Sequence, residues 1–436
     1  MGETISKQLS SMVETSRKWS GEWWVCSEEM QDVSRVPGVL SYTEDGYMEL
    51  ALSPTPNGSS LKCKGQQNYT IWGVDKNGAK ITLFDAYIKD FGWNMSAETM
   101  LVNSAVIGVH ISSLDTPFFR TAVIVYPNLK EFLFVPQVDL DHEGKSVIFK
   151  IEDKPNAEII ISMEEGLKWI LRGHYTWTAK NRCIDVEIKQ DTRFVVECND
   201  PRSVKFYRRQ VDEFSDFLSL ALLGNQDPSE IFFYISDDPS SMCEYLYCVK
   251  ESTKCRFHLI GNSAPVERVP FILKNWHKNY DQIAPIYRYL DRSSFDNHGT
   301  IGIPEFLLVE YALEGYFKRF HNKTMTEGKD VRKLEDQLQK LLEYYKEVEL
   351  ISKLNLDIPA VVDTRDAYTH LIPEEEMTGH EMKDAHQLWV NTEKLRILLY
   401  CCLLNSMGFT MQEIDTNFKT APIVHPERYQ NDFLFE

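Results

Sequence analysis

Arg365 and His370 are the two residues in this chain whose types and spacing best suit catalysis. They lie within the run VVDTRDAYTH, and Pro373 follows shortly afterwards. A histidine can act as general base or acid, and an arginine can neutralise the charge that develops on a phosphorane. The pair could therefore cut RNA without a metal ion, through attack by a 2′-OH on the adjacent phosphorus. Asp366 is a third candidate, because its carboxylate could orient the histidine or position the arginine.

The spacing of this pair is a weak signal by itself, because a chain with 11 histidines offers such matches by chance. Arg292 and His298 form a second match, in a stretch rich in Ser, Asn and Gly that predicts a loop. A loop would not hold either side chain in place. Arg365 and His370 instead lie between segments of helical periodicity. Alternatively, both residues have structural roles: the arginine pairs with a surface carboxylate, and the histidine caps a helix.

Helix geometry supports the Arg365–His370 pairing only in part. Five residues of an ideal helix turn through about 500°, which leaves the two side chains roughly 140° apart. They could converge where the helix ends, and Pro373 disfavours helix at the residue before it. His370 would then lie near a helix C-terminus, where the helix dipole favours its protonated form. A second copy related by a two-fold axis would let groups from both chains surround one phosphate.

The region from about residue 21 to 198 reads as β-structure. Its short strand-like runs are separated by turn signals such as Asp45-Gly46 and Asn77-Gly78. Many short strands with such turns predict a sandwich or a barrel-like sheet. The region contains no phosphate-cradling glycine loop and no nucleophile elbow, so we assign no chemistry to it.

The remainder of the chain is mostly helical. Residues 204–223 and 271–290 have helical spacing, and a strand-rich insert lies between them. Four amphipathic helices with short links then predict a bundle, at 304–321, 330–354, a short helix at 365–370, and 388–408.

The predicted fold class is therefore α+β, with three parts. These are a β-rich N-terminal domain, a mixed connecting region and a C-terminal all-α four-helix bundle, at residues 1–200, 201–300 and 301–436.

Composition limits the functions that the chain can have. The formal net charge of −18 argues against coating nucleic acid non-specifically. It predicts either weak, salt-sensitive binding to bulk RNA or selection of a particular structured RNA. The chain has no apolar run long enough for a membrane span, and its polar N-terminus does not predict secretion. Nine scattered cysteines do not suggest a disulfide framework. We therefore expect a cytoplasmic protein without membrane partners.

Two further clusters could carry chemistry. Cys243, Cys248, Cys255 and His258 offer zinc-ligand types, although their spacing fits no common finger and buried strand cysteines explain them as well. Basic residues at the end of the first bundle helix are candidate RNA contacts, and complementing the helix dipole is the alternative. These residues are Lys318, Arg319, His321 and Lys323.

The chain resembles a known family. Residues 363–370, following the helices at 304–321 and 330–354, resemble the Arg-polar-x3-His signature of HEPN domains. Other stretches resemble the ApeA-like branch of bacterial anti-phage proteins, which join a β-rich N-terminal domain to a C-terminal HEPN domain. These stretches are Trp23–Leu52, Phe214–Gly224, Trp276 and Phe306–Glu314.

The resemblance implies a metal-independent endoribonuclease toxin that needs no cofactor and acts by abortive infection. It also implies a homodimer or higher homo-oligomer with facing motifs, an RNA substrate such as tRNA, and a phage-derived trigger. The position after the arginine is commonly Asn in the family. Asp366 occupies it here, and an ionised Asp cannot donate a hydrogen bond.

Two alternatives to the nuclease stay open. One is a non-catalytic sensor of a phage component, in which the helical bundle only dimerises. The other is a toxin that a partner enzyme controls by nucleotidylation at Tyr368 or a neighbour.

Overall fold

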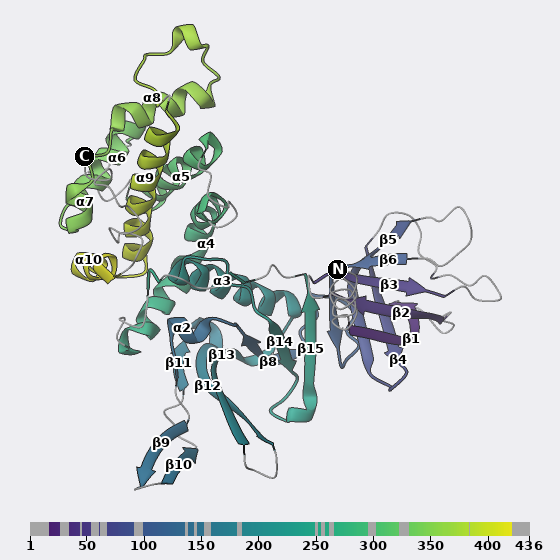
Figure 1. Cartoon of the computed structure of the whole chain (residues 1–436). Coiled ribbons are helices and arrows are strands. Elements are labelled where there is room, and N and C mark those ends of the chain that lie inside the picture. The colour runs from purple at the N-terminus through teal and green to yellow at the C-terminus, as the bar shows by residue number, and fades with distance from the viewer. Residues whose placement is uncertain are drawn as a thin grey trace, which may run out of the picture. The chain divides into compact units, whose positions relative to one another are not determined.

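The structure is a computed structural model of the chain (Figure 1). It describes residues 17–26, 35–43, 46–53, 61, 68–90, 99–135, 138–143, 146–151, 158–180, 185–248, 252–253, 258–260, 266–294, 302–321, 331–382 and 384–420. The chain divides into two compact units. Unit 1 comprises residues 1–130, 134–212 and 227–252, and unit 2 comprises residues 131–133, 213–226 and 253–436. The domain boundaries after residues 200 and 300 stay predictions.

Unit 1 begins with a closed six-stranded antiparallel barrel. Its strands are β1 (Arg17–Val25), β2 (Val36–Tyr42), β3 (Met48–Leu52), β4 (Tyr69–Asp75), β5 (Lys80–Asp90) and β6 (Thr99–Val102). They pair in the order β5-β4-β1-β2-β3-β6, and β6 returns to β5 to close the barrel. Inward side chains fill the interior, among them Trp23, Leu40, Leu50, Ile71 and Leu83, all fully buried. The barrel-like sheet, one of the two architectures predicted for this region, is confirmed.

An open sheet continues from the barrel through β5. Its first half pairs with β7 (Ser104–Ile107) and its second half pairs with β6, so one strand belongs to both structures. The sheet then runs in the order β7-β15-β14-β8-β13-β12-β11. These strands are β8 (Phe119–Val125), β11 (Glu158–Ser162), β12 (Leu167–Lys180), β13 (Asp185–Arg202), β14 (Glu230–Tyr234) and β15 (Met242–Tyr247).

Smaller elements complete unit 1. Strands β9 (Val138–Glu143) and β10 (Ser146–Ile151) form a separate hairpin. Helix α2 (Leu129–Phe132) begins in unit 1, and its last two residues belong to unit 2. The first half of α3 (Val204–Leu222) packs on the sheet, where the Tyr207 hydroxyl donates to the Phe119 carbonyl oxygen. Short 3-10 turns lie at Glu164–Gly166 and Pro239–Ser241.

Unit 2 is helical. After a 3-10 turn at Val266–Arg268 come α4 (Val269–Ser294), α5 (Ile303–Tyr316), a π-helical turn (Phe317–His321), α6 (Leu334–Tyr344), α7 (Glu349–Lys353), α8 (Ile358–Thr369), a 3-10 turn (Glu374–Glu376), α9 (Ala385–Ser406) and α10 (Met411–Thr420). Helix α5 packs against α4 and α9, and α8 contacts α5 and α6. The apolar stripe of α5, from Phe306 to Phe317, is buried as predicted.

The second predicted bundle helix, at 330–354, is interrupted in the structure. Helix α6 ends at Tyr344, a turn follows, and α7 begins at Glu349. Tyr345 and Val348 in the turn are fully buried, and the Tyr345 hydroxyl lies 3.4 Å from that of Tyr316. Core packing of these two residues therefore overrides the helical periodicity. The short helix predicted at 365–370 is longer, because α8 begins at Ile358.

The predicted α+β class, with a β-rich N-terminal part and a helical C-terminal part, is confirmed. In the described residues, no helix is both long and apolar enough to cross a membrane.

The barrel depends on a close approach between a glycine and a tryptophan. A Cβ added to Gly73 would lie 2.3 Å from the Trp23 ring, which is fully buried. We expect Gly73→Ala to lower the free energy of unfolding by about 1–3 kcal/mol, because the ring must move. Urea denaturation of the full chain measures this change. Gly315→Ala is the control, since its Cβ would meet Ile286 at an ordinary 3.8 Å. Equal unfolding midpoints for the two variants would contradict the prediction.

Candidate active site

Helix α8 has defined start and stop signals on either side of the predicted motif. The Asp357 side chain accepts a hydrogen bond from the Ala360 N–H and caps the first turn. At the other end, His370 is the C-cap and Leu371 adopts a left-handed φ of 51°. The Ile372 N–H donates to the Ala367 carbonyl oxygen, which is the Schellman arrangement. The motif histidine is thus placed at a helix C-terminus.

The exposed face of α8 carries His370 together with two carboxylates. At about 100° per residue, Asp363 and His370 lie within roughly 20° of one another around the helix, with Asp366 beside them. Thr364 and Ala367 face the core and are buried. His370 is exposed to solvent.

Arg365 reaches its neighbour's carboxylate across the helix surface. Its Nη1 lies 2.7 Å from Asp366 Oδ1, so the guanidinium turns toward the face that bears His370. The contact is the one that positioning of the arginine by Asp366 requires, and this role of Asp366 stays a prediction. In the part of the chain that the structure describes, no hydrogen bond or ion pair joins the His370 ring to Arg365 or Asp366.

Two glutamates of α5 complete the surroundings of Arg365, and neither was singled out from the sequence. Arg365 Nε lies 3.8 Å from Glu310 Oε2, and Arg365 Nη2 lies 3.8 Å from Glu314 Oε2. Glu314 also pairs with Lys318, at 2.5 Å. The sequence does contain a signal for Glu310, because this charged residue interrupts the apolar stripe that includes Val309 and Leu313. A carboxylate on the buried face of an amphipathic helix needs a partner.

Glu310 is 0% exposed, and this burial decides its charge. Desolvation raises the pKa of Glu310 to about 8, while the Arg365 guanidinium opposes the shift and the Glu314 carboxylate adds to it. Neither Glu310 oxygen has a hydrogen-bond partner among the described residues. At neutral pH the side chain is therefore mostly a neutral acid beside the arginine.

This raised pKa makes stability depend on pH. The folded state keeps a proton that the unfolded chain loses above its ordinary pKa of 4.5. The free energy of unfolding therefore falls as the pH rises from about 4.5 to about 8. We expect Glu310→Gln to remove this dependence and to gain stability over the native chain, by a few kcal/mol at pH 8 and less at pH 5.

Thermal unfolding of both proteins between pH 5 and pH 9 measures the effect. Glu335→Gln, at an exposed position of α6, is the control and should leave the pH profile unchanged. Parallel profiles for the native chain and Glu310→Gln would show that Glu310 does not titrate over this range.

The predicted basic RNA contacts differ in their surroundings. The π-helical turn that carries them, Phe317–His321, is a geometry often found at functional sites. Arg319 Nη1 donates to the Gln282 carbonyl oxygen at 2.9 Å. His321 is buried, which lowers its pKa to about 4, so it is not a surface cation. Lys323 lies outside the described residues.

The segment after His370 folds back onto α8. The Thr378 hydroxyl donates to Asp363 Oδ2 at 2.6 Å, and His380 Nδ1 lies 3.4 Å from the same oxygen. Glu381 accepts hydrogen bonds from the Thr378 and Gly379 N–H groups, and these bonds help to lower the pKa of its carboxyl. This loop therefore supports the exposed face of α8.

The other candidate residues are the possible zinc ligands and the second Arg–His match. Cys243 is buried in β15, which raises its thiol pKa to about 11, and Cys248 is exposed. Cys255 lies outside the described residues, so the proposed zinc set is untested, and no cluster of three metal-ligand side chains occurs in the described ones. His298 of the second Arg–His match also lies outside them.

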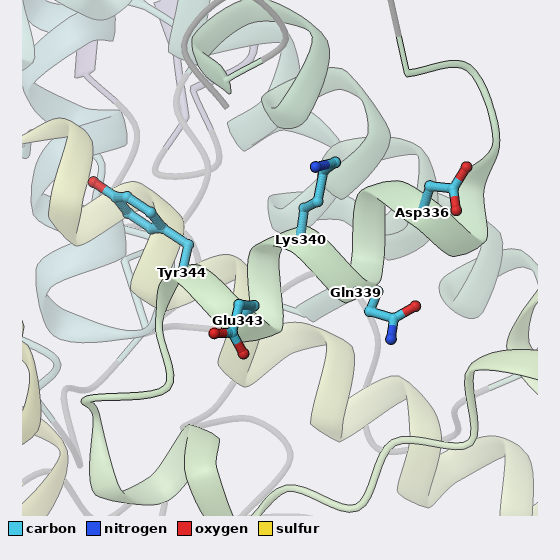
Figure 2. Close-up of a pocket in the computed structure, with 5 residues that line it drawn as sticks. All are labelled: Asp336, Gln339, Lys340, Glu343 and Tyr344. Atoms are coloured by element: carbon cyan, nitrogen blue, oxygen red, sulfur yellow. The ribbon is translucent and has the colours of Figure 1, made fainter. Parts of the chain in front are cut away.

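A hollow of about 520 Å³ lies along one face of α6 (Figure 2). None of the motif residues lines it. The hollow is lined by acidic, basic, amide and aromatic side chains, those of Asp336, Gln339, Lys340, Glu343 and Tyr344. We assign it no chemistry.

Two known families match the chain, one over its N-terminal part and one over its C-terminal part. The family described as Apea-like HEPN matches residues 307–413, which include Arg365 and His370. The helical part is therefore a HEPN domain, a class that is generally nuclease or RNase in activity. The family described as ApeA N-terminal domain 1 matches residues 18–277, more than half of the chain. The chain belongs to the ApeA family, whose members are associated with anti-phage defence. No curated protein and no solved structure matches it.

Proposed function

We propose that the protein is an endoribonuclease of anti-phage defence that cleaves RNA without a metal ion. The observation that carries the proposal is the pairing of Arg365 with Asp366 at the end of α8, next to the exposed His370, in a HEPN domain. In the reaction, the RNA 2′-oxygen attacks the adjacent phosphorus and the bond to the 5′-oxygen breaks. The products are a 2′,3′-cyclic phosphate and a free 5′-hydroxyl.

His370 carries out proton transfer. As a base it takes the proton of the attacking 2′-OH, and as an acid it gives a proton to the leaving 5′-oxygen. Its position at the C-cap of α8 leaves the side chain exposed to solvent, where a substrate can reach it. One imidazole cannot serve on both sides of the phosphorus at once. A homodimer with facing motifs would supply the second histidine, and we propose that state for the active protein.

Arg365 stabilises the charge of the phosphorane. Its guanidinium presents a planar set of donors that fits phosphate oxygens. In the structure this group faces the carboxylates of Asp366 and Glu314 and the mostly neutral acid of Glu310. A phosphate must therefore compete with them, and Asp366 is the nearest competitor.

Removing the motif should abolish cleavage. We expect Arg365→Ala and His370→Ala each to lower the rate by at least about 100-fold, the usual size of a lost general acid–base or oxyanion contact. Purified protein is incubated with total tRNA in EDTA, and the RNA ends are analysed. A cyclic phosphate in the native reaction supports the mechanism.

Arg332→Ala and His386→Ala, at non-motif positions of unit 2, are the matched controls and should keep the native rate. If a motif variant retains full RNA cleavage and full toxicity in cells, the nuclease assignment is wrong. A non-catalytic sensor of a phage component would then explain the protein better.

Asp366 should weaken RNA binding through its charge. Asp366→Asn removes one negative charge beside Arg365 and keeps a side chain of the same shape. We expect the KM for RNA to fall about fivefold, as for the loss of a like charge near a partly exposed site. Steady-state kinetics at low and high salt measure this, because the gain should shrink as salt screens the charge. An unchanged KM at low salt would contradict the competition described here.

The biological setting follows from the family and the charge of the chain. We propose that the protein acts in the cytoplasm, cuts tRNA or a similarly structured RNA, and ends infection by stopping growth of the infected cell. The formal net charge of −18 supports selection of a specific RNA over bulk RNA. Unit 1 would receive the phage-derived trigger.

A further inference from the structure

Two tyrosines of unit 2 lie beside the motif. The Tyr311 hydroxyl of α5 lies 3.2 Å from Thr369 Oγ1 of α8, and Thr369 immediately precedes His370. The ring of Tyr289 from α4 packs on the Tyr311 ring with centroids 6.4 Å apart and planes at 58°. The aromatic pair is therefore tied by a hydrogen bond to the last helical turn before the motif histidine.

Tyr289 differs from the tyrosines that build the core. Its side chain is 39% exposed, whereas Tyr287 on the same helix is 2% exposed and packs on Trp276. Core packing between α4 and α5 thus does not need the exposed face of Tyr289. A large aromatic surface left in water next to a candidate active site is available to a ligand.

Carboxylates beside the motif weaken the electrostatic attraction of RNA to Arg365. Glu314 and Asp366 lie close to the guanidinium, and Asp363 lies on the same face of α8 as His370, whereas Glu310 is mostly neutral. Carboxylates repel phosphates, so an interaction without charge would add binding energy near the scissile bond. Stacking of a base on an aromatic ring supplies such energy without any charge.

We propose that Tyr289 and Tyr311 form a stacking subsite for one unpaired nucleobase of the RNA, adjacent to the scissile phosphate. This inference rests on the proposed RNA cleavage, and it names the class of RNA that would be cleaved. Bases in a duplex are already stacked, whereas bases in loops and single strands can turn outward onto a protein ring. The subsite therefore selects RNA that is unpaired at the cleavage position.

The subsite also has a role in catalysis. Attack by the 2′-oxygen requires that this oxygen, the phosphorus and the leaving oxygen lie in line, which a flexible single strand rarely satisfies. Holding the neighbouring base restricts the nucleotide and raises the population of that arrangement. The Tyr311–Thr369 hydrogen bond ties one ring of the subsite to the residue before His370.

The test uses an RNA that cannot react. A fluorescently labelled hairpin with an unpaired loop and 2′-O-methyl groups throughout is titrated with the full chain, and anisotropy gives the Kd. We expect Tyr289→Ala to raise the Kd about tenfold, the size of one lost base–aromatic contact. Tyr289→Phe and Tyr289→Trp should restore native binding, because each keeps an aromatic face.

Tyr344→Ala is the matched control. Tyr344 lies on α6, is 42% exposed, and contacts the aromatic rings of Tyr345 and His321. Its variant should bind like the native chain. If Tyr289→Ala binds as tightly as Tyr344→Ala, or if Tyr289→Phe fails to restore the Kd, the stacking subsite is wrong.

A second measurement separates this inference from the proposed cleavage. Once the cut is mapped on reactive RNA, an abasic site is placed next to it in the non-reactive hairpin. The native chain should bind the abasic hairpin about tenfold more weakly than the intact one, whereas Tyr289→Ala should bind the two hairpins with nearly equal affinity. Equal losses in both proteins would overturn the subsite while leaving the nuclease intact. Absence of any cleavage by the native chain would instead remove the proposed function, whatever the anisotropy shows.

Discussion

The candidate site depends on the close approach of Arg365 to the buried carboxyl group of Glu310 on α5. Glu310 has no access to water and lies 3.8 Å from the guanidinium, so α5 and α8 must keep this spacing. The arrangement costs stability, because a carboxyl group is buried without a hydrogen bond among the described residues. Proteins tolerate such costs mainly where an arrangement of side chains is used for chemistry. The candidate active site is thus in direct contact with the core of the HEPN domain, through Glu310 and Arg365.

Local signals in the sequence predicted a large part of the fold. Asp45-Gly46 and Asn77-Gly78 indicated turns, and both glycines have positive φ in the structure, 74° and 86°. The stripe that starts at Phe306 indicated α5. Closure of the barrel was less accessible, because the pairing of β6 with β5 joins segments whose contact no local pattern specifies. The break after Tyr344 was missed for a similar reason, since the buried Tyr345 is held by distant parts of the core.

The site was predictable to the extent that it lies on one helix. Arg365, Asp366 and His370 are neighbours in sequence, and their spacing together with the helical segments around them singled them out. Spacing alone also matched Arg292 and His298. Glu310 and Tyr311 come from another helix, and only tertiary packing brings them to α8. A charged residue within an apolar stripe is the signal that would have identified Glu310. No comparable signal marks Tyr311 or Tyr289, because tyrosine is ordinary on a half-buried helix face.

The shared strand β5 has a consequence for how unit 1 loses its structure. Its first half supports the open sheet and its second half closes the barrel, so neither can lose this strand without exposing backbone groups of the other. The two substructures should therefore melt in one cooperative transition, with amide protons of β5 among the slowest to exchange. A molecule that binds the barrel would then protect the whole sheet from proteolysis, including strands that it never touches.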